Sequence, residues 1–282
     1  MSYFLKTKMM ITSLFLGFCT VGLLSCKSLP DVPGIQVVRM DDRQIENVVR
    51  RHDHAAYTLV FESGARNCIE HWGKVLQQVP TNVNVYVYNR PGYCKSSPAL
   101  TTRTSQNIVD ELRLALRQEG LKPPYVLIGH SIGGLYMQHL ARQFPDEVQG
   151  LVLVDAMYPG FLKKSSEFPW YIRMGMTFFI SKTVRDEINF AHADGLMIDA
   201  LPAIDDKPIV RMFNEPKGAH GKAIEVDFGM FNRDEASINK IRNMYPRAKI
   251  VVADSSHQMQ EASPELVVQA INDVMQARGA FQ

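Results

Sequence analysis

Residues 125–134, which read YVLIGHSIGG, limit the possible fold more than any other stretch of the 282-residue chain. The first four residues are apolar, as in a buried strand, and from Ile132 the apolar residues recur at the spacing of a helix. Ser131 therefore lies at a sharp turn between a strand and a helix. Gly129 and Gly133 leave room for these two elements to approach, so the turn presents the Ser131 hydroxyl at the start of the helix.

Strand patterns alternate with helix patterns along most of the chain. Further strands are expected at 35–40, 46–51, 57–62, 83–89, 148–154, 209–213 and 249–253, and further helices at 68–78, 105–119, 235–243 and from 264 onward. Such alternation predicts an α/β fold, with a mostly parallel central sheet flanked by helices.

The segment from about 156 to 207 interrupts this alternation. It joins two predicted strands, is rich in aromatic residues and Met, and has no clear strand pattern. A connection this long is unusual within a compact domain, and we expect it to form a mostly helical cap. Its apolar side chains suit either an ordinary core or the lining of a pocket for an acyl chain.

The overall composition limits the class of protein. Hydrophobic residues make up 46% of the chain and charged residues 21%, as in ordinary globular proteins with a large core. The net charge of +2 and the lack of a basic stripe argue against a nucleic-acid binder. The sequence has neither metal-ligand spacing nor a Gly-rich phosphate-binding pattern, so we expect no metal and no cofactor.

Residues 1–25 have the pattern of a secretory signal peptide. Lys6 and Lys8 precede an uncharged, largely apolar run from Met9 to Leu24. This run is short for a membrane-spanning helix and has the length of the apolar region of a signal peptide. The folded domain is therefore expected to cover residues 35–282.

The apolar run ends in Leu23-Leu24-Ser25-Cys26, which resembles the lipobox of bacterial lipoproteins. The resemblance implies that Cys26 is lipidated, that it becomes the first residue of the mature chain, and that residues 27–34 tether the domain to a membrane. The protein would then be lipid-anchored in the bacterial cell envelope, with its domain on the extracytoplasmic, oxidising side. The alternative is a plain signal peptide that contains a Cys.

Four separated segments resemble the α/β-hydrolase fold family, in that family's order and over about residues 35–278. They are Ser63-Gly64-Ala65, NRPGY at 89–93, GHSIG at 129–133, and Ser256-His257 followed by PELV at 264–267. In that family they form the oxyanion loop, the loop after the fourth strand, the turn of the nucleophile and the loop of the catalytic His. The resemblance implies an α/β-hydrolase fold with a cap between strands 6 and 7. Asn89 replaces the family's usual Asp, and Cys94 replaces a usual Gly.

The resemblance implies that Ser131 is a catalytic nucleophile. A Ser hydroxyl needs a base to remove its proton, and His257, on the loop after the last strand, is the expected base. The backbone N–H groups of Ile132 and Ala65 are expected to stabilise the oxyanion. His130 is expected to be structural, because neighbours on a tight turn point apart.

The third expected member of the site is a carboxylate that orients the base and stabilises its positive charge. Asp155 directly follows the strand at 148–154, where some members of the family carry this acid. Glu215 follows the strand at 209–213, where the family places the acid most often, but without the family's usual turn sequence. Asp155 is favoured, and Glu215 is the alternative.

Cys68 and Cys94 are the two thiols that remain after signal removal and lipidation of Cys26. In the α/β-hydrolase fold the strands that precede them are parallel neighbours, so the loops that leave these strands can come within reach of a disulfide. We expect a Cys68–Cys94 disulfide in an oxidising compartment. Two buried free thiols are the alternative.

The function expected from these residues is that of a serine hydrolase of the esterase or lipase type. It would cleave a carboxylic ester, or a related acyl bond, of a small-molecule substrate through an acyl-enzyme on Ser131. Transfer of the acyl group to an alcohol would use the same residues. A non-catalytic lipoprotein that binds a lipid or a partner on this scaffold is the alternative from another class. Epoxide hydrolases and dehalogenases need a carboxylate nucleophile, which Ser131 does not provide.

Overall fold

The computed structural model describes residues 29–215 and 229–277. Contacts divide the chain into two units, Met1–Pro30 and Asp31–Gln282, and the elements below belong to the second unit. The predicted signal peptide and the predicted lipidation site at Cys26 lie outside the described residues. Within the described ranges, no helix is both long enough and apolar enough to cross a membrane.

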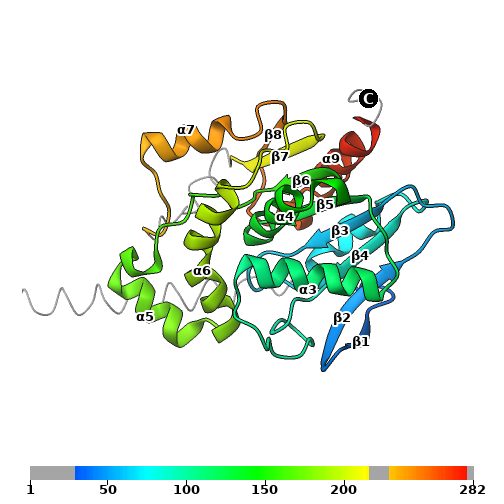
Figure 1. The fold of residues 1–282 in the computed structure, drawn as a ribbon, viewed down its shortest axis with the longest axis horizontal. Coiled ribbons are helices and arrows are strands. Elements are labelled where there is room, and N and C mark those ends of the chain that lie inside the picture. Colours follow the sequence, from blue (N-terminus) through cyan, green and yellow to red (C-terminus); the bar gives the residue numbers. More distant parts are fainter. Residues whose placement is uncertain (1–28, 216–228, 278–282) are drawn as a thin grey trace, which may run out of the picture. The chain divides into compact units, whose positions relative to one another are not determined.

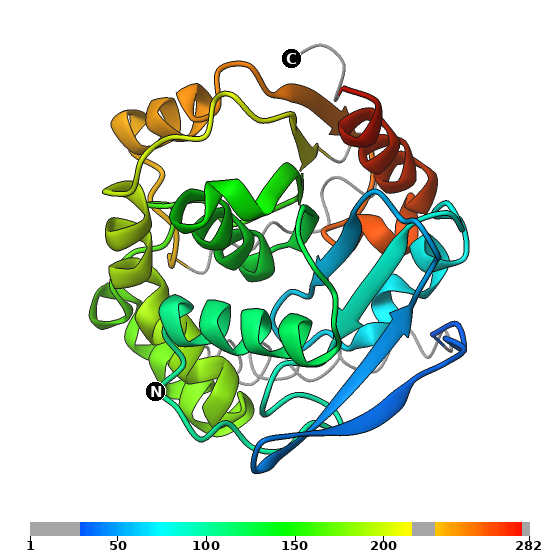
Figure 2. The ribbon, with the colours of Figure 1, turned by 45° about the vertical axis from the view of Figure 1, so that its right-hand side comes forward.

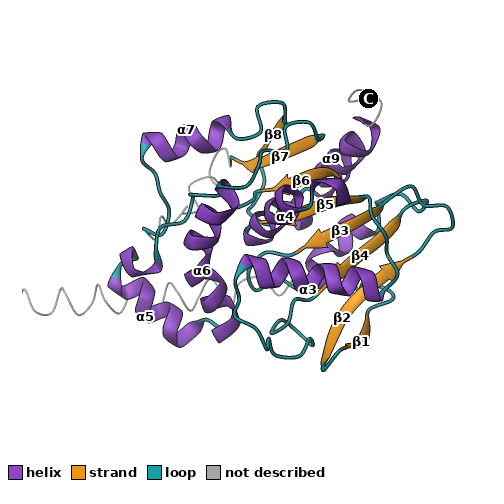
Figure 3. Ribbon diagram, in the orientation of Figure 1, coloured by secondary structure: helices purple, strands orange, loops and turns teal. Residues whose placement is uncertain are grey.

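An eight-stranded sheet forms the centre of the second unit (Figures 1 and 3). Its strands are β1 (Gln36–Met40), β2 (Arg43–Arg50), β3 (Thr58–Glu62), β4 (Asn84–Tyr88), β5 (Tyr125–His130), β6 (Val148–Val154), β7 (Ile209–Asn214) and β8 (Lys249–Ala253). Their spatial order is β1-β2-β4-β3-β5-β6-β7-β8. β2 pairs antiparallel with both β1 and β4, and all pairs from β4 to β8 are parallel. The predicted mostly parallel sheet is confirmed.

Helices cover both faces of the sheet (Figure 2). Successive side chains of a strand point to opposite faces, so Leu59 and Phe61 of β3 join one apolar cluster and Val60 joins the other. The first cluster includes residues of α2 (Gly73–Leu76), α8 (Met259–Ala262) and α9 (Pro264–Gln276), and the second includes residues of α3 (Ser105–Gln118) and α4 (Ile132–Gln143), with Ile241 of α7 (Glu235–Asn243) packed against it. A sheet buried on both faces explains why its strands read as nearly continuous apolar runs.

The helix expected at 68–78 is shorter than predicted and has two parts. A 3-10 turn, η1 (Ile69–Trp72), is followed by a single α-helical turn, α2. Gly73 at the junction is about 1 kcal/mol less favourable in a helix than Ala. The side chains of Ile69, Trp72 and Val75 are fully buried, so packing against the sheet determines this segment more than helix propensity does.

The connection between β6 and β7 contains the predicted helical cap. Its elements are the 3-10 turn η3 (Ser165–Glu167) and the helices α5 (Trp170–Phe179) and α6 (Lys182–Asp199). α6 lies beside α4 (Figure 1). It begins after Ser181, whose hydroxyl oxygen accepts the N–H of Val184 at 3.4 Å, as an N-cap residue does.

The apolar side chains of the cap divide into two groups. Phe168, Ile172 and Met176 are buried in a cluster with residues of α4. Trp170 and Phe178, in contrast, are 66% and 74% exposed. The expectation that the cap's aromatic residues form a core or line a pocket is therefore wrong for these two side chains.

Candidate active site

Ser131 lies at the turn between β5 and α4, with φ 52° and ψ −126°, a conformation that residues with side chains rarely adopt. The neighbouring glycines make this turn possible. A Cβ atom at Gly129 would lie 2.6 Å from the Cα atom of Gly134, and one at Gly133 would lie 2.5 Å from the carbonyl oxygen of Glu62. The strand and the helix thus approach as closely as the sequence predicts, at a distance that only glycine allows.

The parallel strands bring the predicted site residues to one edge of the sheet. β3, β5 and β6 are parallel neighbours, so the loops that carry Ala65, Ser131 and Asp155 leave the sheet at the same edge. His257 follows β8 at this edge. Among all the residues that the structure describes, no three His, Cys, Asp or Glu side chains are grouped so that they could hold a metal ion.

Ser131, His257 and Asp155 form a continuous chain of hydrogen-bond distances. The Nε2 atom of His257 lies 3.1 Å from Ser131 Oγ, and its Nδ1 atom lies 2.7 Å from Asp155 Oδ2. An Nδ1–H group that donates to Asp155 leaves the Nε2 lone pair to accept the Ser131 hydroxyl. The His257 side chain is 54% exposed, so water can reach the imidazole.

The backbone of β7 holds Asp155 in place. The Asp155 N–H donates to the carbonyl oxygen of Met212 at 3.0 Å, and Asp155 Oδ1 accepts the N–H of Asn214 at 3.3 Å. The second carboxylate oxygen then faces His257. Glu215, the alternative acid, is an exposed residue directly after β7. Of the two candidates, Asp155 is the one that bonds to His257.

The two predicted oxyanion donors lie in the loops beside Ser131. Ile132 is the first residue of α4, and the first N–H groups of a helix have no partner within that helix. Ala65 follows Gly64, where a Cβ atom would lie only 3.1 Å from Ser131 Cβ. An anion formed beside Ser131 Oγ would therefore lie at the positive end of α4 and next to the loop that carries Ala65.

His130 supports the loop that carries His257. It is buried, and its Nε2 lies 2.8 Å from the His257 carbonyl oxygen. Asn67 Nδ2 lies 3.4 Å from His130 Nδ1 and donates to Gln258 Oε1 at 2.7 Å. Burial, followed by the charge of His257, lowers the pKa of His130 to about 3, so this ring is neutral and donates through Nε2–H. The expected structural role fits these contacts, whereas no sequence pattern marks Asn67 or Gln258.

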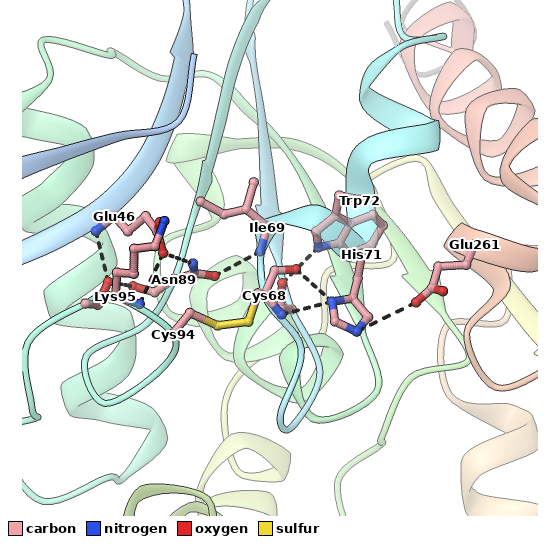
Figure 4. The surroundings of a disulfide bond; sticks show 11 residues. Glu46, Cys68, Ile69, His71, Trp72, Asn89, Cys94, Lys95 and Glu261 are labelled. Carbon is pink, nitrogen blue, oxygen red and sulfur yellow. Dashed lines mark hydrogen bonds and ion pairs between the residues drawn. A yellow bond between two sulfur atoms is a disulfide. The ribbon is translucent and has the colours of Figure 1, made fainter. Parts of the chain in front are cut away.

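The structure contains a disulfide between Cys68 and Cys94, the pairing that the sequence predicts (Figure 4). Their Cα atoms are 6.2 Å apart, within the usual range for a disulfide. Cys94 has φ 48°, a conformation that glycine adopts most easily. The disulfide gives a reason for a side chain at this position, because it joins the loop after β4 to the segment that follows Ser63-Gly64-Ala65.

Asn89 joins the same two segments (Figure 4). Its Oδ1 accepts the N–H of Ile69 at 2.9 Å, and its Nδ2 donates to Glu46 Oε2 at 2.7 Å. An ionised Asp could accept the first bond but could not donate the second. Asn89 in place of the usual Asp therefore suits this site, because its amide group can donate to the carboxylate of Glu46.

Comparison with known proteins supports the fold described above. A family model described as alpha/beta hydrolase fold matches residues 57–190. The carboxylesterase CesB from Bacillus subtilis superposes with a TM-score of 0.61 and 12% identity, over 88% of this chain and 93% of that chain. The epoxide hydrolase CorEH superposes with a TM-score of 0.62 and 13% identity, over 86% of this chain and 98% of that chain. The chain has the α/β-hydrolase fold.

Curated relatives match shorter segments. The uncharacterized protein YqjL of Bacillus subtilis is 30% identical over 105 residues, which are 37% of this chain and 42% of that protein. The uncharacterized protein YbdG of the same organism is 32% identical over 75 residues, or 27% of this chain and 23% of that protein. The chain thus covers less than half the length of either relative. Since the α/β-hydrolase fold serves both an esterase and an epoxide hydrolase, the residues of the site must decide the activity.

A series of buried ion pairs in this α/β-hydrolase fold was not predicted from the sequence. We call it the buried charge ladder, and its members are, in order, Glu62, Arg90, Glu187, Arg103, Glu111 and Arg43. All six are buried. Burial raises the pKa of the Glu62 carboxyl above its ordinary value, against the opposing effect of the Arg90 guanidinium. Because its members are far apart in sequence, no local pattern reveals the ladder.

Arg90 is the member of the ladder that lies against the loop beside Ser131. It donates to Glu62 and, at 2.6 Å, to the carbonyl oxygen of Ser63, at the start of the loop that carries Ala65. Its Nε and Nη2 groups donate to both carboxylate oxygens of Glu187 on α6. This bidentate geometry fixes the guanidinium in one orientation. Arg90 therefore joins the cap directly to the loop beside Ser131.

Proposed function

We propose that the protein is a serine hydrolase that cleaves a carboxylic ester through an acyl-enzyme on Ser131. The observation that carries this proposal is the chain of contacts from Ser131 Oγ to His257 and on to Asp155 Oδ2. The match to the family model supports a hydrolase in general. The finer assignment depends on the site, because Ser131 occupies the position from which a nucleophile would act.

In the first half of the proposed reaction, Ser131 Oγ attacks the carbonyl carbon of the ester while His257 Nε2 takes the hydroxyl proton. Asp155 stabilises the imidazolium and keeps its Nδ1–H oriented. The N–H groups of Ile132 and Ala65 stabilise the negative charge on the former carbonyl oxygen. The tetrahedral intermediate then expels the alcohol, which takes its proton from His257 Nε2.

In the second half, a water molecule attacks the acyl-enzyme carbonyl and gives a proton to His257. Collapse of the second tetrahedral intermediate breaks the bond to Ser131 Oγ, returns the proton to Ser131 and releases the carboxylic acid. The exposure of His257 suits this step, because water must reach its Nε2 atom. An alcohol that entered in place of water would receive the acyl group, so acyl transfer is the second outcome that the same residues support.

A fluorophosphonate probe tests the proposal, since it reacts with a serine that a neighbouring base activates. We expect the probe to modify Ser131 of the full chain, as located by mass spectrometry of peptides. Ser131→Ala should abolish labelling and ester hydrolysis, whereas Ser166→Ala, which changes an exposed serine of η3, should leave both unchanged. Circular dichroism must show that both variants are folded.

A folded parent protein that takes up no probe at Ser131 would instead favour the non-catalytic, lipid- or partner-binding alternative. If Ser131 is labelled, initial rates on acyl esters from short to long chains would define the acyl preference. Adding an alcohol to the same assay would separate hydrolysis from acyl transfer, because transfer yields a new ester.

A further inference from the structure

Helix α5 of the cap presents an apolar stripe to solvent. Trp170, Met174 and Phe178 are spaced four residues apart, so they lie along one side of the helix. Their side chains are 66%, 39% and 74% exposed. Tyr171, on the adjoining side, is 48% exposed, and its ring lies against that of Trp170. Contiguous exposed apolar surface on a folded domain commonly marks an interaction site.

The opposite side of α5 is buried. Ile172 and Met176 lie two residues after Trp170 and Met174, which is about 200° around a helix. They belong to the same apolar cluster as Ile132, and Ala65 packs against that cluster. α5 thus needs only its inner side for the fold, and the outer side is available for a partner.

The charges around α5 indicate the chemistry of this partner. Arg173 is the only charged residue of α5 itself. Between 163 and 186, five basic residues stand against two acidic ones: Lys163, Lys164, Arg173, Lys182 and Arg185 against Glu167 and Asp186. An apolar stripe with Trp and Tyr, in a segment of the sequence with excess positive charge, has the composition of helices that lie in the interface of anionic lipid bilayers.

The length of chain before the domain fits the same partner. Gln36, at the start of β1, lies ten positions after Cys26, the predicted lipidation site. The chain between them spans at most about 35 Å when fully extended. If Cys26 is lipidated, the domain therefore stays close to the membrane surface.

We propose that the outer side of α5 binds the surface of an anionic lipid bilayer. The binding itself does not depend on the proposed hydrolase activity. If that activity is correct, the inner side of the same helix links this surface to the cluster around Ile132, so Ser131 would receive amphiphilic esters directly from the lipid.

Trp170 is a built-in probe for this contact. The chain has two tryptophans, and the other, Trp72, is fully buried. We would add the full-length protein to vesicles of equal parts phosphatidylcholine and phosphatidylglycerol, with lipids brominated along the acyl chains. We expect a blue shift and quenching of Trp170 emission, and loss of both responses in Trp170→Phe.

A double variant tests the stripe while the probe stays in place. Met174→Ser/Phe178→Ser should weaken the binding of α5 to the bilayer roughly tenfold, because two large apolar side chains no longer enter the lipid. Leu100→Ser is the matched control, because Leu100 is 69% exposed and lies outside the cap, and it should leave the quenching unchanged. Both variants must retain the parent's melting temperature.

Three results would overturn the proposal. In the first, vesicle-bound protein shows no more quenching than Trp170→Phe. In the second, quenching is equally strong with phosphatidylcholine alone, which removes the role of the anionic lipid. In the third, Trp170 emission is already blue-shifted without vesicles, which would mean that another copy of the chain or its own residues 9–24 cover the stripe. Dilution would distinguish the two possible covers, because it removes a second copy of the chain but not residues 9–24 of the same chain.

Discussion

Asp155 and His257 lie 102 positions apart in the chain, yet Asp155 Oδ2 and His257 Nδ1 are 2.7 Å apart. The contact is made across β7, whose backbone holds Asp155 through Met212 and Asn214. The carboxylate that contacts His257 therefore lies at the end of β6, one strand earlier than Glu215, which follows β7.

Asp155→Asn should lower kcat for ester hydrolysis by about 10³–10⁴, because an amide can stabilise the wrong tautomer of His257 and cannot neutralise the imidazolium. Glu215→Gln is the matched control and should change kcat little. Both variants are compared by steady-state kinetics on one ester. The assignment of the acid is wrong if the large loss occurs in Glu215→Gln and not in Asp155→Asn.

The disulfide should stabilise the folded protein. The bond closes a loop with a sequence separation of 26, for which the entropy of the unfolded chain predicts about 3–4 kcal/mol. Cys68→Ser/Cys94→Ser should lower the free energy of urea unfolding by this amount. Intact mass after alkylation without reductant reports the bond directly, and two alkylated thiols in the mature parent protein would contradict it.

His130 should make the folded protein less stable as the pH falls. The folded-state pKa of about 3 lies below the ordinary value of 6.5, so between these values the unfolded chain binds a proton that the folded protein does not. As the pH is lowered through this window, the free energy of unfolding should therefore decrease, by up to about 1.4 kcal/mol per pH unit.

His130→Gln isolates this effect, because Gln can still donate to the His257 carbonyl but does not titrate. Burial raises the pKa of Asp194 to about 6, which has the opposite effect on stability between about pH 4 and 6. The measurement is therefore the difference between parent and variant in urea unfolding at pH 4 and pH 7. A pH-independent difference would show that His130 does not titrate as expected.

Cys26→Ser tests the predicted lipid anchor. A serine cannot form the thioether that carries the lipid, so the variant should leave the membrane fraction or remain unprocessed. Immunoblots of membrane and soluble fractions distinguish these results. Normal processing together with unchanged membrane retention would count against lipidation at this residue.

The fold could be predicted largely because its signals are local. Apolar runs such as 125–128 and 148–154 mark strands that are buried on both faces, and the glycines beside Ser131 mark the close approach of β5 and α4. His257 could be selected because strand order places it at the same edge. The sequence favoured Asp155 over Glu215 as the partner of His257 but could not decide firmly. Each of them follows a strand that ends at this same edge of the sheet.

Other features depend on contacts that no local pattern carries. Helical spacing gives α5 two apolar stripes, one with Ile172 and one with Trp170, and spacing alone does not tell which stripe faces the core. Asn67 lies in no recognisable pattern and is linked to Gln258 through a hydrogen bond across 191 positions. The orientation of α5 and the bond between Asn67 and Gln258 both depend on tertiary packing, which cannot be read from a local sequence pattern.

The buried charge ladder limits which changes of sequence the cap can accept. Glu187 neutralises Arg90 from within the cap, so an exchanged cap without a carboxylate at this point would leave a buried guanidinium partly unpaired, at a cost of about 3–5 kcal/mol. Any replacement of the cap must therefore keep a carboxylate that reaches Arg90. The ladder passes through α6 and includes no residue of α5, so substitutions on the exposed side of α5 leave it intact.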